Sequence, residues 1–234
     1  MKAIFLLLLL PFSYTFGQSK KKEPQKVSTS EMQPQNSIDS LSYSIGVQVA
    51  EYYKQTQNVE KINAEYVKKA FNDVYNNKTL SMSEEEANRC IQQKLQQFMA
   101  NKIKSVKDSG QKFLEENKTR PGVVTLPDGM QYEVIKKGTG PIPTANDTVK
   151  ANYVGTLIDG KEFDNSYKRG EPLTIPVSGV IRGWTEALQM MPVGSTWKLF
   201  IPSDLAYGDR GAGGVIPGGA TLIFTIELLD IINK

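Results

Sequence analysis

The first pattern in the chain is an apolar block that follows a short basic start. Residues 3–12 are almost wholly apolar and come directly after Met1 and Lys2. Small residues near Gly17 stand where a signal peptidase would cleave. The block is too short to span a bilayer comfortably. We therefore predict a secretory signal peptide over residues 1–17 and an exported protein without a stable membrane anchor; an uncleaved anchor is the alternative.

Residues 18–37 form a polar stretch in which hydrophobic periodicity is lost. They are rich in Lys, Gln, Ser and Pro and contain few apolar residues. A segment of this kind cannot bury enough apolar surface to fold by itself. We predict a flexible tail, and we interpret the three lysines at 20–22 as part of that solvated tail rather than as a binding patch.

Apolar positions return at helical spacing over residues 38–80. Leu41, Ile45 and Val49 lie four residues apart, and a second helical pattern follows Asn63. Asp39 and the serine after it are expected to cap the first helix. Helices this short cannot form a core alone. They must pack on other surfaces, for example on a second copy of themselves.

The longest helical pattern covers residues 81–118. Ser83 and Glu86 have the spacing of a capping box at its start. The apolar stripe, which includes Val106 and Phe113, is thin and broken, so we interpret the helix as a spacer. About 36 residues would reach about 54 Å. The alternative is a pair of helices that fold back at Gly110, its one weak helix former.

Alternation of apolar and polar residues begins after Pro121 and Gly122, which end the helical pattern. It predicts strands around 130–134, 149–157, 197–201 and 222–228. Asp159 and Gly160 provide a hairpin turn, followed by further extended residues to Phe163. A short helix is expected over 183–190. Residues 119–234 are therefore expected to form an antiparallel sheet with one short helix, and the whole chain to be α+β.

Composition narrows the chemistry that this chain can perform. It has 234 residues, a net charge of +3, one Cys and no His. That charge is too small to predict binding to nucleic acid. A single Cys cannot form an internal disulfide, and the lack of His excludes Ser-His-Asp triads, Cys-His dyads and His-ligated metals. No clustered carboxylates suggest a metal site, so we expect neither a metal nor another cofactor.

Several motifs in the second half resemble one enzyme family. They read YVGTL at 153–157, DGKEFDNS at 159–166, VIRGW at 180–184, IPSDLAYG at 201–208 and ATLIF at 220–224. In their order and spacing they resemble FKBP-type peptidyl-prolyl cis-trans isomerases, over about residues 122–232. The resemblance implies a twisted antiparallel sheet wrapped over the short helix, with the substrate pocket between them.

The resemblance also implies roles for individual residues in that pocket. Trp184 would be the floor, and the Tyr207 hydroxyl and the Ile181 N–H would bind substrate carbonyls. Asp164 would lie at the rim near Tyr207 and Arg169. The implied catalytic residues are Tyr153, Phe163, Asp164, Trp184, Tyr207 and Phe224, and the implied substrate-binding residues are Arg169, Leu173, Val180, Ile181 and Ile216. Many family members carry Phe where this chain has Leu173.

Each of these residues also has a simpler interpretation that the sequence leaves open. The ring side chains could be ordinary core aromatics, Asp164 could cap a turn, and Arg169 could merely pair with Asp164. An X-Pro bond nevertheless needs no nucleophile to rotate. Its barrier of roughly 18–20 kcal/mol comes from amide resonance, and exchange takes tens of seconds or more. An apolar slot with a few fixed donors is sufficient chemistry.

The first half resembles the macrophage infectivity potentiator subgroup of the same family, through SYSIG at 42–46 and LPDGMQY at 126–132. That resemblance implies a homodimer formed through residues 38–118 and a periplasmic protein, with outer-membrane association or secretion as alternatives. The predicted function is isomerisation of X-Pro bonds in unfolded exported proteins. The alternative is a non-catalytic holdase chaperone that binds Pro-containing segments.

Overall fold

The computed structural model describes residues 33–57 and 59–232. The predicted signal peptide and most of the predicted tail lie outside these residues. The chain divides into two compact units, one ending at Thr56 and the other beginning at Gln57. We describe each unit by itself.

From residue 33 on, the first unit contains one helix, α1 (Ser37–Glu51), which continues as a π-helical turn over Tyr52–Thr56. Its capping residue is Asn36, whose side chain accepts a hydrogen bond from the Asp39 N–H at 2.9 Å. The prediction that Asp39 caps this helix was therefore wrong. Asp39 lies in the first turn, where its carboxylate accepts a hydrogen bond from Asn36 Nδ2 at 2.9 Å and suits the positive helix end.

Two helices begin the second unit. The first, α2 (Ala64–Tyr75), begins after Asn63, whose side chain caps it. The second, α3 (Glu84–Asn117), begins with the predicted capping box, in which Ser83 and Glu86 bond reciprocally. The Ser83 backbone N–H, with its hydroxyl, lowers the pKa of Glu86. Because α3 is continuous, the alternative of two helices folded back at Gly110 was wrong.

The second half of α3 packs against the sheet and is not only a spacer. Gly110 is buried, and a Cβ atom there would lie 2.3 Å from Thr221 Oγ1. The rings of Phe113 and Phe200 lie 5.9 Å apart. Asn117 is also buried and donates to Gln131 Oε1 at 2.8 Å. The thin apolar stripe of this half therefore has a partner within the same chain.

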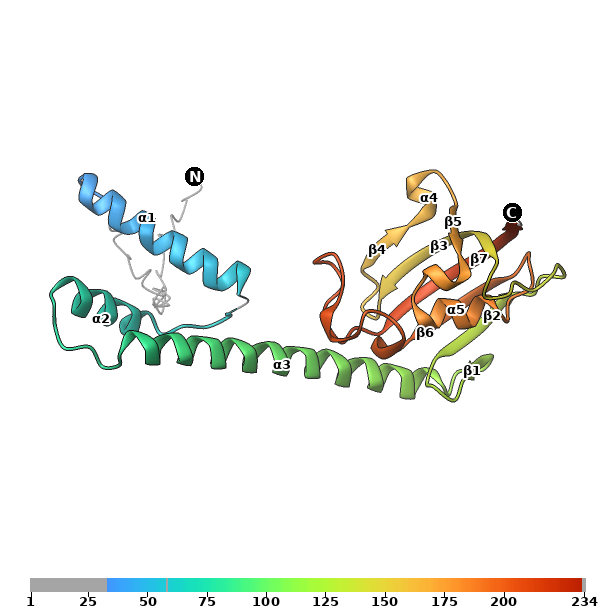
Figure 1. The fold of residues 1–234 in the computed structure, drawn as a ribbon, viewed down its shortest axis with the longest axis horizontal. Helices are drawn as coiled ribbons and strands as arrows, with labels where there is room; N and C mark the ends of the chain where they lie inside the picture. Colours follow the sequence, from blue (N-terminus) through green and yellow to red (C-terminus); the bar gives the residue numbers. More distant parts are fainter. Residues whose placement is uncertain (1–32, 58, 233–234) are drawn as a thin grey trace, which may run out of the picture. The chain divides into compact units, whose positions relative to one another are not determined.

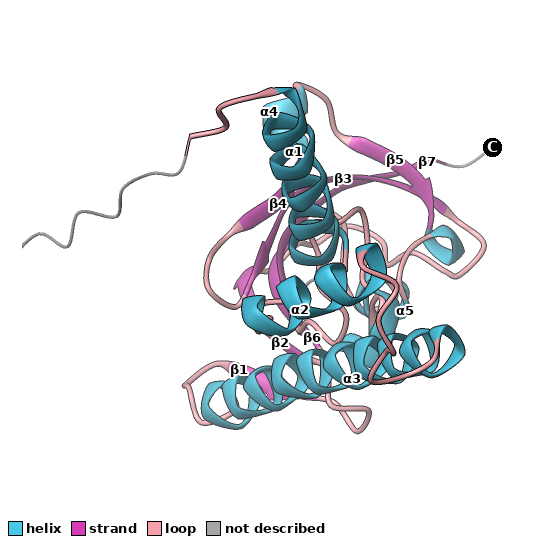
Figure 2. Ribbon diagram, turned by 90° about the vertical axis from the view of Figure 1, so that its left-hand side faces the viewer, coloured by secondary structure: helices cyan, strands magenta, loops and turns pink. Residues whose placement is uncertain are grey.

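The rest of the second unit is one antiparallel sheet of seven strands (Figures 1 and 2). The strand order is β1-β2-β6-β7-β3-β4, and β5 pairs with the other end of β3. The strands are β1 (Val123–Thr125), β2 (Gln131–Lys136), β3 (Thr148–Leu157), β4 (Glu162–Asn165), β5 (Leu173–Pro176), β6 (Thr196–Ile201) and β7 (Leu222–Ile232). Together with the helices, this sheet confirms the predicted α+β fold class.

Two short helices interrupt the strands, α4 (Ser166–Arg169) and α5 (Arg182–Leu188). Figure 1 shows α5 lying across one face of the sheet, where it covers the main core. Gly183 permits this contact, since a Cβ atom there would lie 2.6 Å from Ile201 Cγ2. The core is formed by alternate strand residues and by α5, and includes Val149, Ala151, Leu199, Ile201, Ile226, Leu228, Trp184, Ala187 and Leu188.

Candidate active site

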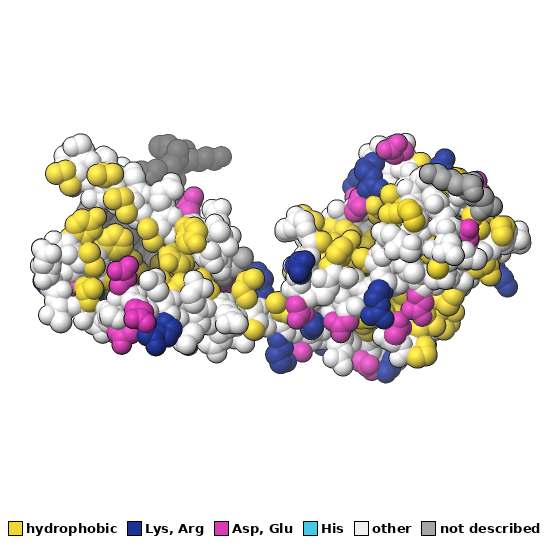
Figure 3. All heavy atoms as spheres, viewed as in Figure 1, with side chains coloured by type: hydrophobic (Ala, Val, Ile, Leu, Met, Phe, Trp, Pro, Cys, Tyr) yellow, Lys and Arg dark blue, Asp and Glu magenta, His cyan; other side chains and the backbone are white. Residues whose placement is uncertain are grey.

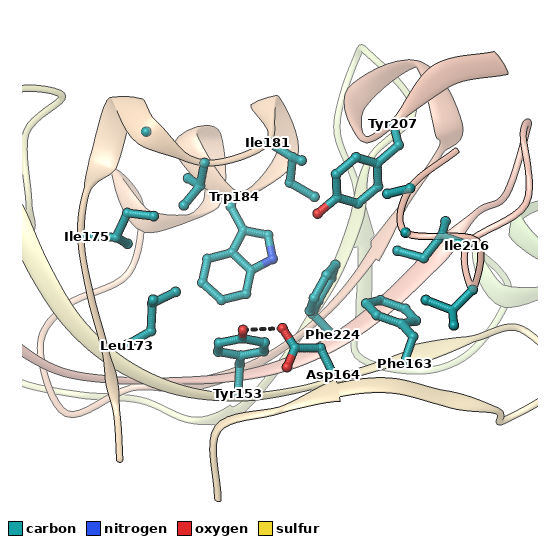
Figure 4. Close-up of a pocket in the computed structure, with 15 residues that line it drawn as sticks. Tyr153, Phe163, Asp164, Leu173, Ile175, Ile181, Trp184, Tyr207, Ile216 and Phe224 are labelled. Carbon is teal, nitrogen blue, oxygen red and sulfur yellow. Dashed lines mark hydrogen bonds between the residues drawn. The ribbon is translucent and has the colours of Figure 1, made fainter. Parts of the chain in front are cut away.

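A cavity of about 610 Å³ lies between the sheet and α5 (Figure 4). Its size is that of an ordinary small-ligand pocket. The predicted site residues that line it are Tyr153, Phe163, Asp164, Leu173, Val180, Ile181, Trp184, Tyr207, Ile216 and Phe224. Arg169 is the one predicted residue that does not line it. The structure thus brings together residues that are more than 70 positions apart in sequence.

The inner part of the cavity consists of aromatic rings from four elements. Trp184 reaches in from α5, and the rings of Tyr153 on β3 and Phe224 on β7 meet it edge-on at 5.0 and 5.2 Å. Phe163 on β4 meets Phe224 edge-on at 5.5 Å. Edge-to-face contacts fix the orientation of each ring as well as its position. Figure 4 shows the indole of Trp184 at the centre of this group.

Gly155 makes room for these rings on the central strand β3. A Cβ atom at this position would lie 2.6 Å from Phe163 Cε2 and 2.8 Å from Phe224 Cε1. Any side chain would therefore push both rings into the cavity. The sequence contains Gly155 inside a recognisable motif but does not reveal this steric role, which depends on the β3–β4 and β3–β7 pairings.

The Tyr153 hydroxyl, Asp164 and Arg169 form a polar cluster at one rim. The hydroxyl donates to Asp164 Oδ2, and Arg169 Nη1 pairs with the other carboxylate oxygen. Arg169 Nη2 also donates to the Tyr153 hydroxyl at 2.9 Å, and its guanidinium lies 5.2 Å from the centre of that ring. Arg169 therefore contacts Tyr153 and Asp164 but does not itself line the cavity.

Asp164 pairs with Tyr153 and not with Tyr207, the tyrosine predicted to lie near it. Burial raises the pKa of Tyr153, and the hydrogen bond to Asp164 raises it further. Tyr153 therefore remains protonated at neutral pH. The Tyr153 hydroxyl already donates its proton to the Asp164 carboxylate. It therefore stabilises the site and is not available as a donor to a ligand.

Tyr207 lies at the opposite rim and is 40% exposed. Figure 4 shows its hydroxyl directed into the cavity across from Asp164. Burial raises the pKa of Tyr207, and the negative charge of Asp164 adds to the effect. Over the described residues this hydroxyl donates to no protein group, so it is a protonated donor available to a ligand.

A second free donor lies just before α5. The Ile181 carbonyl accepts the N–H groups of Trp184 at 2.9 Å and Thr185 at 3.1 Å. Its own N–H donates to no group in the part of the chain that the structure describes. The cavity thus combines an aromatic slot with the free donors of Tyr207 and Ile181, and such a site can orient carbonyl groups on either side of an apolar ring.

Five further residues line the cavity that were not among the predicted site residues, namely Ile175, Gly179, Ala212, Gly213 and Val215. Ile175 belongs to β5, a strand that was not predicted, although Leu173 and Ile175 already show its alternation. Gly179 ends a short 3-10 helix (Val177–Gly179), and the other three lie in a loop whose path the sequence pattern does not define. Within the described ranges, no group of three or more His, Cys, Asp or Glu side chains could hold a metal ion.

Comparison with known proteins places these features in a family. A family model described as FKBP-type peptidyl-prolyl cis-trans isomerase matches residues 140–229, and a model of the domain amino-terminal to it matches residues 38–134. The "Outer membrane protein MIP" of Legionella longbeachae is 44% identical over 200 residues, which cover 82% of this chain and 85% of that protein.

Two further relatives extend the similarity over nearly their whole length. The "FKBP-type 22 kDa peptidyl-prolyl cis-trans isomerase" of Escherichia coli is 41% identical over 194 residues, covering 82% of this chain and 94% of that protein. The crystal structure of FkpA from Escherichia coli matches with a TM-score of 0.68 at 35% identity, covering 84% of this chain and 97% of that one.

Proposed function

Because the chain belongs to the FKBP-type peptidyl-prolyl cis-trans isomerases, we propose that it catalyses X-Pro bond rotation in unfolded exported proteins and so assists their folding. The observation that carries this proposal is the cavity itself, in which an aromatic slot lies between two free donors. The slot contains no acid–base pair and needs none, since the reaction breaks no covalent bond.

The cavity suits the twisted amide better than either planar isomer. Rotation removes amide resonance and with it part of the charge separation between oxygen and nitrogen. An apolar site stabilises that less polar state relative to the planar one. We propose that the proline ring lies over Trp184, while the Tyr207 hydroxyl and the Ile181 N–H hold carbonyls of the peptide. Tyr207 and Ile181 already line the cavity in the structure without substrate, which limits the reorganisation needed.

We further propose that two chains associate through residues 38–118. Many apolar side chains on α1 and α2 are exposed in the single chain, as the yellow surface over these helices in Figure 3 shows. They include Ile38, Leu41, Val47, Tyr66, Phe71, Val74 and Tyr75. Helices that expose such faces require a partner. In this proposal residues 38–80 dimerise, residues 81–118 connect, and residues 119–234 form the isomerase domain.

An exported location is supported by the apolar start of the sequence and by a relative named as an outer membrane protein. Among the described residues, no helix is both long and apolar enough to cross a membrane. We propose the periplasm as the compartment in which the protein meets its unfolded clients.

The test is a protease-coupled isomerisation assay on a short X-Pro peptide. Replacing Tyr207 by Phe should lower kcat/KM about three- to tenfold, the equivalent of one hydrogen bond. Asp164→Ala should lower it as well, because Tyr153 loses its acceptor. Tyr167→Phe is the matched control, since that hydroxyl lies outside the cavity and donates to Glu227 at 3.0 Å. If the wild type and both site variants were equally inert yet prevented client aggregation, the holdase alternative would replace this proposal.

A further inference from the structure

One loop lies between the cavity and α3. It comprises residues 207–221 and is called the active-site loop here. Its inner side contributes Tyr207, Ala212, Gly213, Val215 and Ile216 to the cavity. The Gly219 N–H donates to the Gly208 carbonyl at 2.9 Å, which closes the two ends of the loop on each other. The outer side of the same loop rests on the middle of α3.

An ion pair joins the helix to this loop. Lys107 Nζ lies 2.6 Å from Asp209 Oδ1 and 3.5 Å from Asp204 Oδ1. Asp209 follows Tyr207 by two residues, and Asp204 precedes it by three. The lysine therefore contacts the chain on both sides of Tyr207. The hydrogen bond to Asp209 also raises the pKa of Lys107, so the ammonium stays charged at neutral pH.

Close backbone packing makes a second, independent contact between the same elements. A Cβ atom at Gly219 would lie 2.8 Å from Lys107 Cγ and 2.9 Å from the Ile103 carbonyl oxygen. A Cβ atom at Gly218 would lie 3.2 Å from Ile103 Cγ1. Gly218 and Gly219 therefore let the loop backbone lie directly on one face of α3. This face includes the helical turn from Ile103 to Lys107.

We infer that Lys107 is a positioning residue for the isomerase site, which it serves by holding the active-site loop against α3. The Tyr207 hydroxyl has no hydrogen-bond partner in the protein among the described residues, so its position follows the backbone of this loop and the packing of the ring. Small displacements of a positioned group reduce catalysis strongly. This inference rests on the proposed role of Tyr207, and it makes α3 part of the catalytic unit.

The experiment compares Lys107→Met with Lys104→Met in the full-length protein. Lys104 is a matched control, because it lies one turn away and, within the described residues, its ion pair is with Asp108 on the same helix, at 2.6 Å. The side chains of Lys107 and Asp209 are 38% and 62% exposed. For a pair this exposed we expect kcat/KM to fall about two- to fivefold in Lys107→Met, and amide exchange over residues 207–221 to become faster.

The salt dependence of kcat/KM distinguishes loss of the ion pair from loss of folding. At about 1 M salt the screening length is about 3 Å, so the difference between wild type and Lys107→Met should shrink, while Lys104→Met stays like wild type throughout. Lys107→Arg should restore most of the activity. Unchanged loop exchange in Lys107→Met, or unchanged kcat/KM, would each overturn the inference. The exchange measurement does not depend on catalysis, so it remains decisive even if Tyr207→Phe proves fully active.

Discussion

Tyr153 and Tyr207 face each other across the cavity and are held in different ways. Tyr153 bonds to Asp164 and Arg169 and meets the edge of Trp184, so three groups define its place. Tyr207 has no such partners in the described structure and depends on its backbone. Asp164 influences both, through a hydrogen bond to the first and through its charge on the second. The fixed tyrosine shapes the slot and the free one is available to the substrate.

Glu186 on α5 makes stability depend on pH. Burial raises its pKa above 4.5, and a hydrogen bond with Asp128 raises it further. A carboxyl group whose pKa is higher in the folded state stabilises the fold below its unfolded pKa, and this contribution is lost as pH rises through the folded pKa. Glu186→Gln should therefore stabilise the protein at about pH 7 by ~0.5 kcal/mol, discounted for its partial exposure, and by less at about pH 4.

Thermal unfolding at the two pH values measures this difference, with exposed Glu171→Gln as the control. The control should shift the midpoint equally little at both. If Glu186→Gln raised the unfolding midpoint by the same amount at low and at neutral pH, ionisation of Glu186 would not be the cause.

Ten of the fifteen residues that line the cavity could be predicted from the sequence, but which tyrosine bonds to Asp164 could not. Every aromatic residue that forms a wall of the cavity lies in one of the motifs, because each also occupies a strand or helix position that the sequence pattern reveals. Which tyrosine bonds to Asp164 depends instead on strand register. Asp164 pairs with Gly155 on β3, two residues from Tyr153, and the register shifts just beyond that point. An irregularity of one residue is invisible to an alternation pattern.

Among the elements, the long regular strands were predictable, and so was the short strand β4 because a turn precedes it, whereas the short strands β1 and β5 were not. β3 and β7 have four or more apolar positions at period two, whereas β5 has only Leu173 and Ile175 before Pro176. Proline argues against a strand unless it lies at a strand end or a sheet edge. Here Pro176 pairs with Thr148 at the end of β3. The missed strand contributes one wall of the cavity, which explains why Ile175 was missed with it.

Gly110 lowers the helix propensity of α3 but allows the helix to pack closely against Thr221. Replacing glycine by alanine within a helix normally stabilises it by about 0.5–1 kcal/mol. At Gly110 the new Cβ atom would lie 2.3 Å from Thr221 Oγ1, at the end of the active-site loop. We expect Gly110→Ala to lower the free energy of unfolding instead, by ~1 kcal/mol or more, as overpacking does.

Urea unfolding would measure this effect, and two further variants would identify its cause. Gly46→Ala in α1 is the control, because a Cβ atom there would have no neighbouring atom within 4 Å, and it should not destabilise. Adding Thr221→Ala to Gly110→Ala should recover most of the loss. A stable Gly110→Ala single variant would mean that α3 and the loop can separate at little cost.

At the scale of the whole molecule, the two halves of α3 have different surroundings. Its second half packs on the sheet and the active-site loop through Ile103, Gly110 and Phe113. Its first half exposes Phe98 and Met99, and α1 and α2 expose apolar side chains as well. The hydrophobic pattern alone could not distinguish the packed half of α3 from the exposed half. An apolar stripe has the same period whether it packs on its own chain or on a second chain.

Deleting residues 38–80 separates the proposed assembly from the proposed catalysis. The deletion removes α1 and α2 and leaves every residue of the cavity together with the packed half of α3. We expect a monomer by sedimentation, with near wild-type kcat/KM on a short X-Pro peptide but slower catalysis of Pro-limited refolding of a protein client. Full-length Tyr207→Phe provides the opposite case, since it should stay dimeric and show the same loss of activity, about three- to tenfold, on both substrates. If the deletion left sedimentation unchanged, the dimer interface would have to lie elsewhere; if it removed peptide activity, the helices would be part of the site.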